Sequence, residues 1–232
     1  MLTEQQVARY SRQIILPGVG GKGQQTLLSA SAAIIGAGQM AATAAIYLVA
    51  AGLGTIRLGG PHDIDLADLE ALNPDCQVAP WPAEVDTVGA ENIARGHDFT
   101  IVAGAAAEAT AALNLACVRL GKPLVWGGAE GNVGRMAVFA GGQPGMPCYG
   151  CLQPRLEEDY SARDSSQPGG AMFDAVAAFV GTLQATTVIK MVLKLEECTP
   201  PRLLTYDGLT AIVHQTAIAK DPRCHVCGAP SS

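Results

Sequence analysis

The chain has 232 residues, of which 49% are hydrophobic and 16% are charged. This apolar content supports a folded core of substantial size and excludes an intrinsically disordered chain. The 21 acidic residues outnumber the 15 basic ones, the formal net charge is -6, and the basic residues form no cluster. We therefore expect no nucleic-acid binding, because such binding depends on clustered positive charge.

The first 30 residues are expected to form an N-terminal helical arm. Thr3 followed by Gln6 has the spacing of a capping box and predicts a helix over residues 4–13. A second, short helix is predicted over residues 23–28. The first residues lack the basic segment followed by an apolar segment that marks a secretory signal, so we expect a cytoplasmic protein.

Residues 31–140 are expected to form a Rossmann-like core. The predicted strands cover residues 32–35, 55–58, 100–103 and 124–126, and the predicted helices cover residues 39–51 and 105–120. This alternation is typical of the α/β class, with a mostly parallel sheet and helices on both faces. The segment from residue 59 to about residue 86 is rich in Pro and Asp and is expected to be irregular.

The uncharged stretch over residues 23–56 is long enough to resemble a membrane span. Gly36, Ala37 and Gly38 interrupt it, and polar Gln39 follows. We interpret the stretch as strand, turn, helix and strand, each buried in protein, and we expect no membrane association.

Residues 141–232 are expected to contain metal-binding cysteines, a polar crossover loop, a long helix and closing strands. The predicted bounds are residues 135–140 for a preceding strand, 155–170 for the loop, 171–194 for the helix, and 203–206 and 211–215 for the closing strands. The sequence has no internal repeat and no low-complexity tract, so we expect one continuous domain over residues 1–232.

A glycine-rich turn with the pattern G-x-G-x-x-A, Gly36 to Ala41, follows the first predicted strand and opens a helix. In this context backbone N–H groups can bind a phosphate, although tight strand–helix turns also use glycine for steric reasons. A dinucleotide site would carry an acidic residue at the end of the second strand, where Gly59-Gly60-Pro61 stands instead. A nicotinamide-dependent oxidoreductase is therefore disfavoured.

Four of the seven cysteines form two C-x-x-C pairs, Cys148 with Cys151 and Cys224 with Cys227. Together they predict a structural four-cysteine zinc site that fastens the C-terminal tail to the middle of the chain and leaves no open coordination position. The alternatives are unrelated surface thiols or a redox-active pair. Neither pair is expected at the start of a helix, which would lower a thiol pKa.

The remaining cysteines are weaker candidates for function. Cys117 recurs at helical spacing with apolar residues and is expected in the core. Cys76 and Cys198 lie in polar stretches next to proline and are candidates for exposed thiols. The histidines show no metal-ligand spacing.

Several motifs occur in order over nearly the whole chain: RYSRQIILP from Arg9, the turn from Gly36, AGLGTI from Ala51, GKPLV from Gly121, CYGCL from Cys148, GTLQA from Gly181 and DPRCHVCG from Asp221. Together they resemble the ThiF/MoeB/HesA branch of the ubiquitin-activating-enzyme superfamily. The resemblance implies a homodimeric adenylation domain with structural zinc. It also implies that MgATP is used to adenylate the C-terminal glycine of a small ubiquitin-like sulfur carrier.

Carried over by position, the resemblance gives an incomplete nucleotide site. The family's ribose-binding acid falls on Gly60, its phosphate-facing arginine within residues 68–72, and its metal-binding aspartate within residues 103–106. A segment with a phosphate-contacting lysine is deleted, and Ser165-Ser166 stands where some members carry a loop thiol. The charged residue that survives is Arg12, which in the family reaches the phosphates of the neighbouring subunit. The expected nucleotide contacts are Arg12, Gly36, Ala37, Gly38, Gln39 and Ala41.

Adenylation needs fixed cations and Mg²⁺ beside the phosphates, and loss of one such group typically costs about 10²–10³ in rate. The sequence therefore predicts a pseudoenzyme that keeps the family scaffold. It would bind a ubiquitin-like carrier or an active paralogue through the loop over residues 155–170 and the late strands. The alternative is a functional adenylyltransferase with an altered nucleotide site that uses Arg12, Gln39 and either His62 or Arg135.

Overall fold

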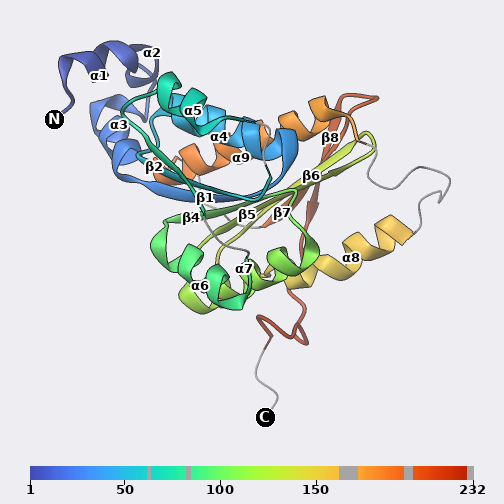
Figure 1. Cartoon of the computed structure of the whole chain (residues 1–232). Helices are drawn as coiled ribbons and strands as arrows, with labels where there is room; N and C mark the ends of the chain where they lie inside the picture. The colour runs from blue at the N-terminus through green and yellow to red at the C-terminus, as the bar shows by residue number, and fades with distance from the viewer. Residues whose placement is uncertain (62–63, 82–84, 162–171, 196–200, 229–232) are drawn as a thin grey trace.

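The computed structural model describes residues 1–61, 64–81, 85–161, 172–195 and 201–228. Its centre is one eight-stranded sheet with the strand order β3-β2-β1-β4-β5-β6-β7-β8 (Figure 1). The strands are β1 Ser31–Gly36, β2 Thr55–Gly59, β3 Gln77–Pro80, β4 Phe99–Ala103, β5 Leu124–Glu130, β6 Val133–Phe139, β7 Arg202–Asp207 and β8 Ile212–Ala217. The helices are α1 Glu4–Arg9, α2 Ser11–Ile14, α3 Gly20–Ser29, α4 Gly38–Ala51, α5 Leu66–Leu72, α6 Thr87–Gly96, α7 Ala107–Leu120, α8 Tyr149–Ser161 and α9 Asp174–Val192.

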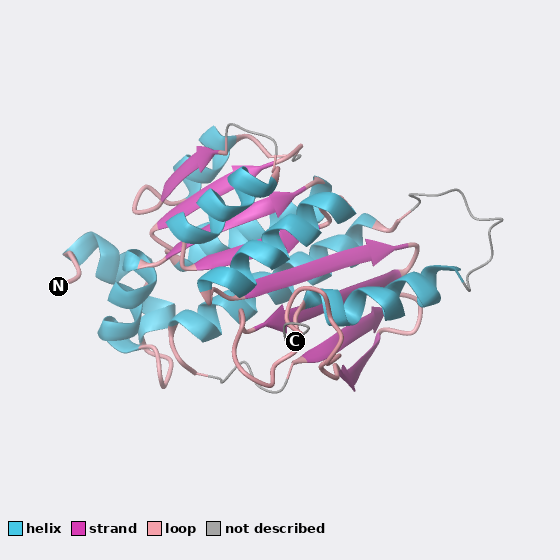
Figure 2. Ribbon diagram, turned by 90° about the horizontal axis from the view of Figure 1, so that it is seen from below, coloured by secondary structure: helices cyan, strands magenta, loops and turns pink. Residues whose placement is uncertain are grey.

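The first five strands pair in parallel, and β6, β7 and β8 extend the sheet by antiparallel pairing. Helices α4 and α9 lie on one face of the sheet, and α6, α7 and α8 lie on the other (Figures 1 and 2). The predicted α/β class, with a mostly parallel sheet, helices on both faces and a C-terminal strand extension, is confirmed.

Helix α9 has the length and apolar composition of a membrane span. In this structure it packs on the sheet beside α4, and Ala177, Val180 and Val188 are buried in the same core cluster as residues of α4. The two helices approach closely at Gly181, where a Cβ atom would lie 2.4 Å from the Met40 carbonyl oxygen. Helix α9 is thus a core helix of the fold.

In the N-terminal arm, the helix predicted over residues 4–13 is divided into the two short helices α1 and α2, because the chain bends at Tyr10. The capping box of Thr3 and Gln6 is confirmed at the start of α1. The buried Tyr10 hydroxyl accepts a hydrogen bond from the Asn73 amide (2.9 Å) and donates one to Asp75 (3.1 Å). These bonds hold the arm against the segment between α5 and β3.

Two segments expected to be irregular contain regular structure. Residues 59–86 include α5 and β3, and α6 follows them. The carboxylates of Asp65 and Asp86 cap α5 and α6 by accepting from the N–H groups of Ala67 and Gly89, and β3 is held by parallel pairing with β2. The predicted loop over residues 155–170 begins inside α8, and its remainder, residues 162–170, lies outside the described residues.

Candidate functional site

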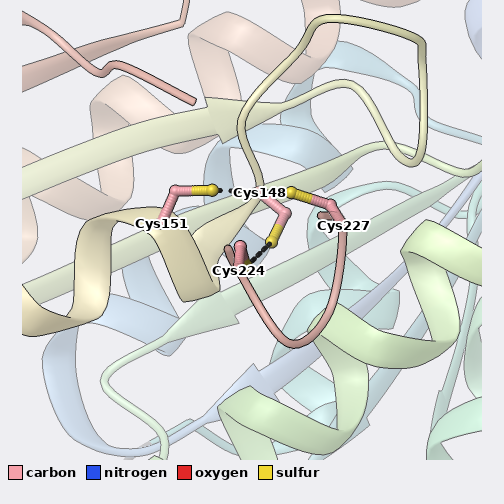
Figure 3. A group of neighbouring side chains, drawn as sticks. All are labelled: Cys148, Cys151, Cys224 and Cys227. Atoms are coloured by element: carbon pink, nitrogen blue, oxygen red, sulfur yellow. Dashed lines mark hydrogen bonds between the residues drawn. The ribbon is translucent and has the colours of Figure 1, made fainter. Parts of the chain in front are cut away.

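The two C-x-x-C pairs meet in one cluster. The four sulfur atoms lie within 4.8 Å of one another and point toward a common centre (Figure 3). The sulfurs of Cys148 and Cys224 are 3.7 Å apart, and those of Cys151 and Cys227 are 3.4 Å apart. A tetrahedral zinc ion with bonds of about 2.3 Å would hold its sulfurs about 3.8 Å apart. The cluster therefore fits a metal ion, and zinc as its identity stays a prediction.

The local chain conformation presents these sulfurs from two tight segments. Cys148 directly precedes α8 and Cys151 lies in its first turn, which corrects the expectation that neither pair would begin a helix. In the tail, the Gly228 N–H donates to the Cys224 carbonyl oxygen (2.8 Å) and closes the turn that holds the second pair. A Cβ atom at Gly150 would lie 3.3 Å from the Cys224 sulfur, so glycine leaves room for the cluster.

Burial raises the pKa of the Cys148 and Cys227 thiols. Burial acts in the same direction on Cys224, but hydrogen bonds from the backbone N–H groups of Cys227 and Val226, together with those from the side chains of Cys148 and Cys151, outweigh it and lower the pKa of this thiol. The cluster therefore contains one thiol with a lowered pKa, that of Cys224, and two with a raised pKa, those of Cys148 and Cys227. A bound cation would favour the ionised form of all four, since thiolates are the metal-binding form.

The glycine-rich turn lies between β1 and α4, and protein groups already occupy part of it. The Ala37 N–H donates to the Ala103 carbonyl oxygen and the Gly38 N–H donates to that of Pro61, both at 3.1 Å. No side chain of the described residues caps the start of α4. Two of the N–H groups that would cradle a phosphate are therefore paired with backbone carbonyl oxygens.

The end of β2 packs tightly on this turn. Gly60 has a φ of +96°, and a Cβ atom there would lie 2.2 Å from the Gly36 carbonyl oxygen. This is the position onto which the family's ribose-binding acid falls, so an acidic side chain does not fit in the present backbone. The segment after β4, residues 103–106, contains only alanine and glycine.

Arg12 is exposed on α2 and is not brought to the glycine-rich turn within one chain. The neighbouring Gln13 donates to the Ala51 carbonyl oxygen (2.9 Å), at the C-terminal end of α4. The turn is at the N-terminal end of the same helix, whose 14 residues span about 21 Å. Exposed Gln39 and buried Ala41 lie in the first turn of α4, beside the glycines.

The other residues considered from the sequence have varied positions. Arg135 is buried on β6, between β5 and β7. Cys117 is buried as predicted, whereas the expectation of an exposed thiol at Cys76 is wrong: its sulfur is buried against the Val49 carbonyl oxygen, because β3 and α4 cover it. His62 and Cys198 lie outside the described residues.

The sequence reasoning missed Asn114, a buried residue of α7 that contacts the cysteine cluster. In the sequence, Asn114 is marked only as a polar residue on the apolar side of a predicted helix. The partner is 34 residues away along the chain, so local pattern does not reveal it.

The fold and the cysteine cluster define a Rossmann-like α/β protein in which four cysteines, two of them from the C-terminal tail, are placed so that they can hold a metal ion. The profile of the ThiF family matches residues 10–71 and 66–226. The chain therefore belongs to the ThiF family.

Comparison with known proteins gives the same relationship. The chain is 32% identical to the sulfur carrier protein adenylyltransferase of Thermus thermophilus, over 97% of this chain and 92% of the relative. It is also 32% identical to the adenylyltransferase and sulfurtransferase MOCS3-1 of Drosophila pseudoobscura pseudoobscura, over 98% of this chain but only 55% of that relative.

Solved structures share the fold at lower sequence identity. A crystal structure of E. coli MccB with MccA-N7isoASN has a TM-score of 0.74 at 19% identity, and the match covers 95% of this chain and 75% of that one. PaaA has a TM-score of 0.74 at 15% identity, with 94% and 84% covered. At these identities the likeness establishes the fold alone.

Proposed function

We propose that this chain is a ThiF-family protein that binds a ubiquitin-like sulfur carrier, or an active paralogue, and that adenylates the carrier poorly or not at all. The observation that carries the proposal is the packing of the glycine-rich turn. The Pro61 carbonyl oxygen is hydrogen-bonded to the N–H at the start of α4, and Gly60 lies against Gly36 without room for a side chain.

The chemistry explains why this packing matters. Adenylation builds negative charge on the α-phosphate and on the leaving pyrophosphate, so N–H groups, cations and Mg²⁺ must be held there in advance. The segments at the ends of β2 and β4, residues 59–61 and 103–106, contain only Gly, Ala and Pro. Loss of a single stabilising group costs about 10²–10³ in rate, so loss of several predicts a deficit of many powers of ten, even though the effects are not additive.

The second candidate is a functional adenylyltransferase with an altered nucleotide site. The 32% identity to a sulfur carrier protein adenylyltransferase over 97% of the chain favours it. Such an enzyme would use Gln39 beside the turn and Arg12 from a second copy, because within one chain the arm is fastened to the far end of α4. A homodimer belongs to this proposal, as do a cytoplasmic location and structural zinc.

ATP–pyrophosphate exchange, measured on the full chain with and without a small ubiquitin-like protein ending in Gly-Gly, distinguishes the candidates. The T. thermophilus relative with a carrier serves as the positive control. We expect calorimetric binding of the carrier without exchange above background. Exchange at a rate near that of the control would refute the loss of adenylation, and absence of carrier binding would refute the proposed partner.

If exchange occurs, a matched pair of variants tests the altered site. Arg12→Ala should abolish exchange, whereas replacement of Arg119, an exposed arginine at the end of α7, should not.

Metal analysis of the wild-type chain should give about one zinc per chain, as a closed four-cysteine site requires. A folded protein without metal would refute the predicted zinc site.

A further inference from the structure

The buried side chain of Asn114 connects the cysteine cluster to the Rossmann-like core. Asn114 lies on α7 and is 2% exposed. Its amide N–H donates to the Cys148 sulfur at 3.6 Å, and its amide oxygen accepts the Tyr149 N–H at 3.0 Å. The two polar groups of this side chain are thus hydrogen-bonded to two consecutive residues, the first cysteine of the cluster and the first residue of α8.

This arrangement does two physical tasks at once. The Tyr149 N–H is one of the first N–H groups of α8, which have no partner inside the helix, and Asn114 supplies one from a neighbouring helix. The other half of the amide directs a hydrogen-bond donor at a sulfur. A buried amide is costly unless its groups are paired, so the pairing with Cys148 explains why an asparagine is tolerated on this apolar side of α7.

We propose that Asn114 is a positioning residue of the metal centre, which holds the Cys148 sulfur in place and fixes the start of α8 to α7. The proposal depends on the four cysteines binding a metal ion. Residues that orient metal ligands from outside the coordination shell typically change metal affinity by about 10–100-fold when they are removed. Four thiolates around a divalent ion carry a net negative charge, which an N–H donor stabilises and a carboxylate would oppose.

Two variants separate the two tasks. Asn114→Asp keeps an oxygen that can accept the Tyr149 N–H, but it replaces the donor that faces the Cys148 sulfur with a negatively charged oxygen. Asn114→Leu removes both bonds. Thr110→Val is the matched control, because Thr110 is a buried polar residue one turn earlier on α7 whose hydroxyl bonds the Ala106 carbonyl oxygen.

Metal affinity is measured by competition with a chromophoric zinc chelator on the full chain, and the site is also loaded with Co²⁺ to follow the thiolate-to-cobalt absorption band. We expect Asn114→Asp to weaken zinc binding by at least about 10-fold and to shift this band, and Thr110→Val to leave both unchanged. If Asn114 served only to cap α8, the Asp variant would bind metal like the wild type, and that result would overturn the proposal.

The number of zinc ions bound per wild-type chain distinguishes a failure of this proposal from a failure of the predicted metal site. A wild-type chain that binds no zinc refutes the metal site itself. A wild-type chain with one zinc, together with an Asn114→Asp variant of unchanged affinity and spectrum, refutes only the role of Asn114. Circular dichroism and urea unfolding of the zinc-loaded variants report folding. If Asn114→Asp and Thr110→Val lower the stability and the zinc affinity to the same extent, the loss of affinity in the Asp variant reflects general destabilisation, and this result also counts against the proposal.

Discussion

Substitution of Gly60 tests how tightly the end of β2 is packed on the glycine-rich turn. In Gly60→Ala, the new Cβ atom would lie 2.2 Å from the Gly36 carbonyl oxygen, and the φ of +96° is unfavourable for any residue with a Cβ atom. Gly104→Ala is the matched control. Gly104 also has a positive φ, +70°, but a Cβ atom there would be 3.9 Å from its nearest neighbour, the Ala37 carbonyl oxygen.

Both variants strain the backbone, but only Gly60→Ala also brings its Cβ atom into a steric clash. Backbone strain alone costs about 1–2 kcal/mol, which is the expected loss for Gly104→Ala. Overpacking adds about 1–3 kcal/mol, so Gly60→Ala should lose about 2–5 kcal/mol in total. For a chain of this length each kcal/mol lowers the Tm by about 2–4 °C. We therefore expect a clearly lower Tm for Gly60→Ala than for Gly104→Ala.

Thermal unfolding followed by circular dichroism measures both losses, and calorimetry with MgATP measures nucleotide binding in the same samples. Gly60→Asp should be destabilised and should gain no affinity for nucleotide, because its carboxylate has no space beside Gly36. Equal stability of Gly60→Ala and Gly104→Ala would refute the tight packing. An Asp variant that is stable and binds MgATP would refute the inference that the turn is closed to a ribose-binding acid.

Two further predictions concern buried groups. Burial, assisted by the charge of Asp75, raises the pKa of Cys76 from 9.0 to about 12. The unfolded chain therefore releases this proton first, and the free energy of unfolding should fall as the pH rises from 9 to 12, by about 1.4 kcal/mol at pH 10. Urea titrations of Cys76→Ala should lack this loss, and an unchanged pH dependence would contradict it. Gly181→Ala should destabilise the chain by about 1–3 kcal/mol, because α9 must move away from α4. Gly96→Ala, with no atom within 4 Å of the new Cβ, should not, and equal losses would refute the contact.

The parts of the fold that were predictable are those with a strong local pattern. Strands β1 and β4 are nearly continuous buried apolar runs, and the two C-x-x-C pairs are visible as short motifs. The short elements α5 and β3 were missed because their stability comes from pairing and capping. Asp65 is nonetheless a capping residue that the sequence displays.

Contacts between residues that are far apart in the sequence could not be predicted from it. The bond between Asn114 and Cys148, and the packing of Gly60 on Gly36, depend on how strands and helices are ordered in space. The same holds for Arg12, whose motif is clear in the sequence. Its distance from the glycine-rich turn becomes apparent only when Gln13 is seen bonded to the end of α4.

The two ends of the chain are fastened to the core by contacts that do not involve the glycine-rich turn. At the N-terminal end, Tyr10 and Arg9 hold the arm through Asp75. At the C-terminal end, the cysteine cluster joins the tail to α8. Neither attachment needs a nucleotide, so substitutions at the turn can remove adenylation without loosening the arm, the tail or the late strands. Under the proposed function, this separation is the physical reason that the partner surface would persist after the loss of adenylation. It also means that carrier binding and pyrophosphate exchange must be measured independently in this protein.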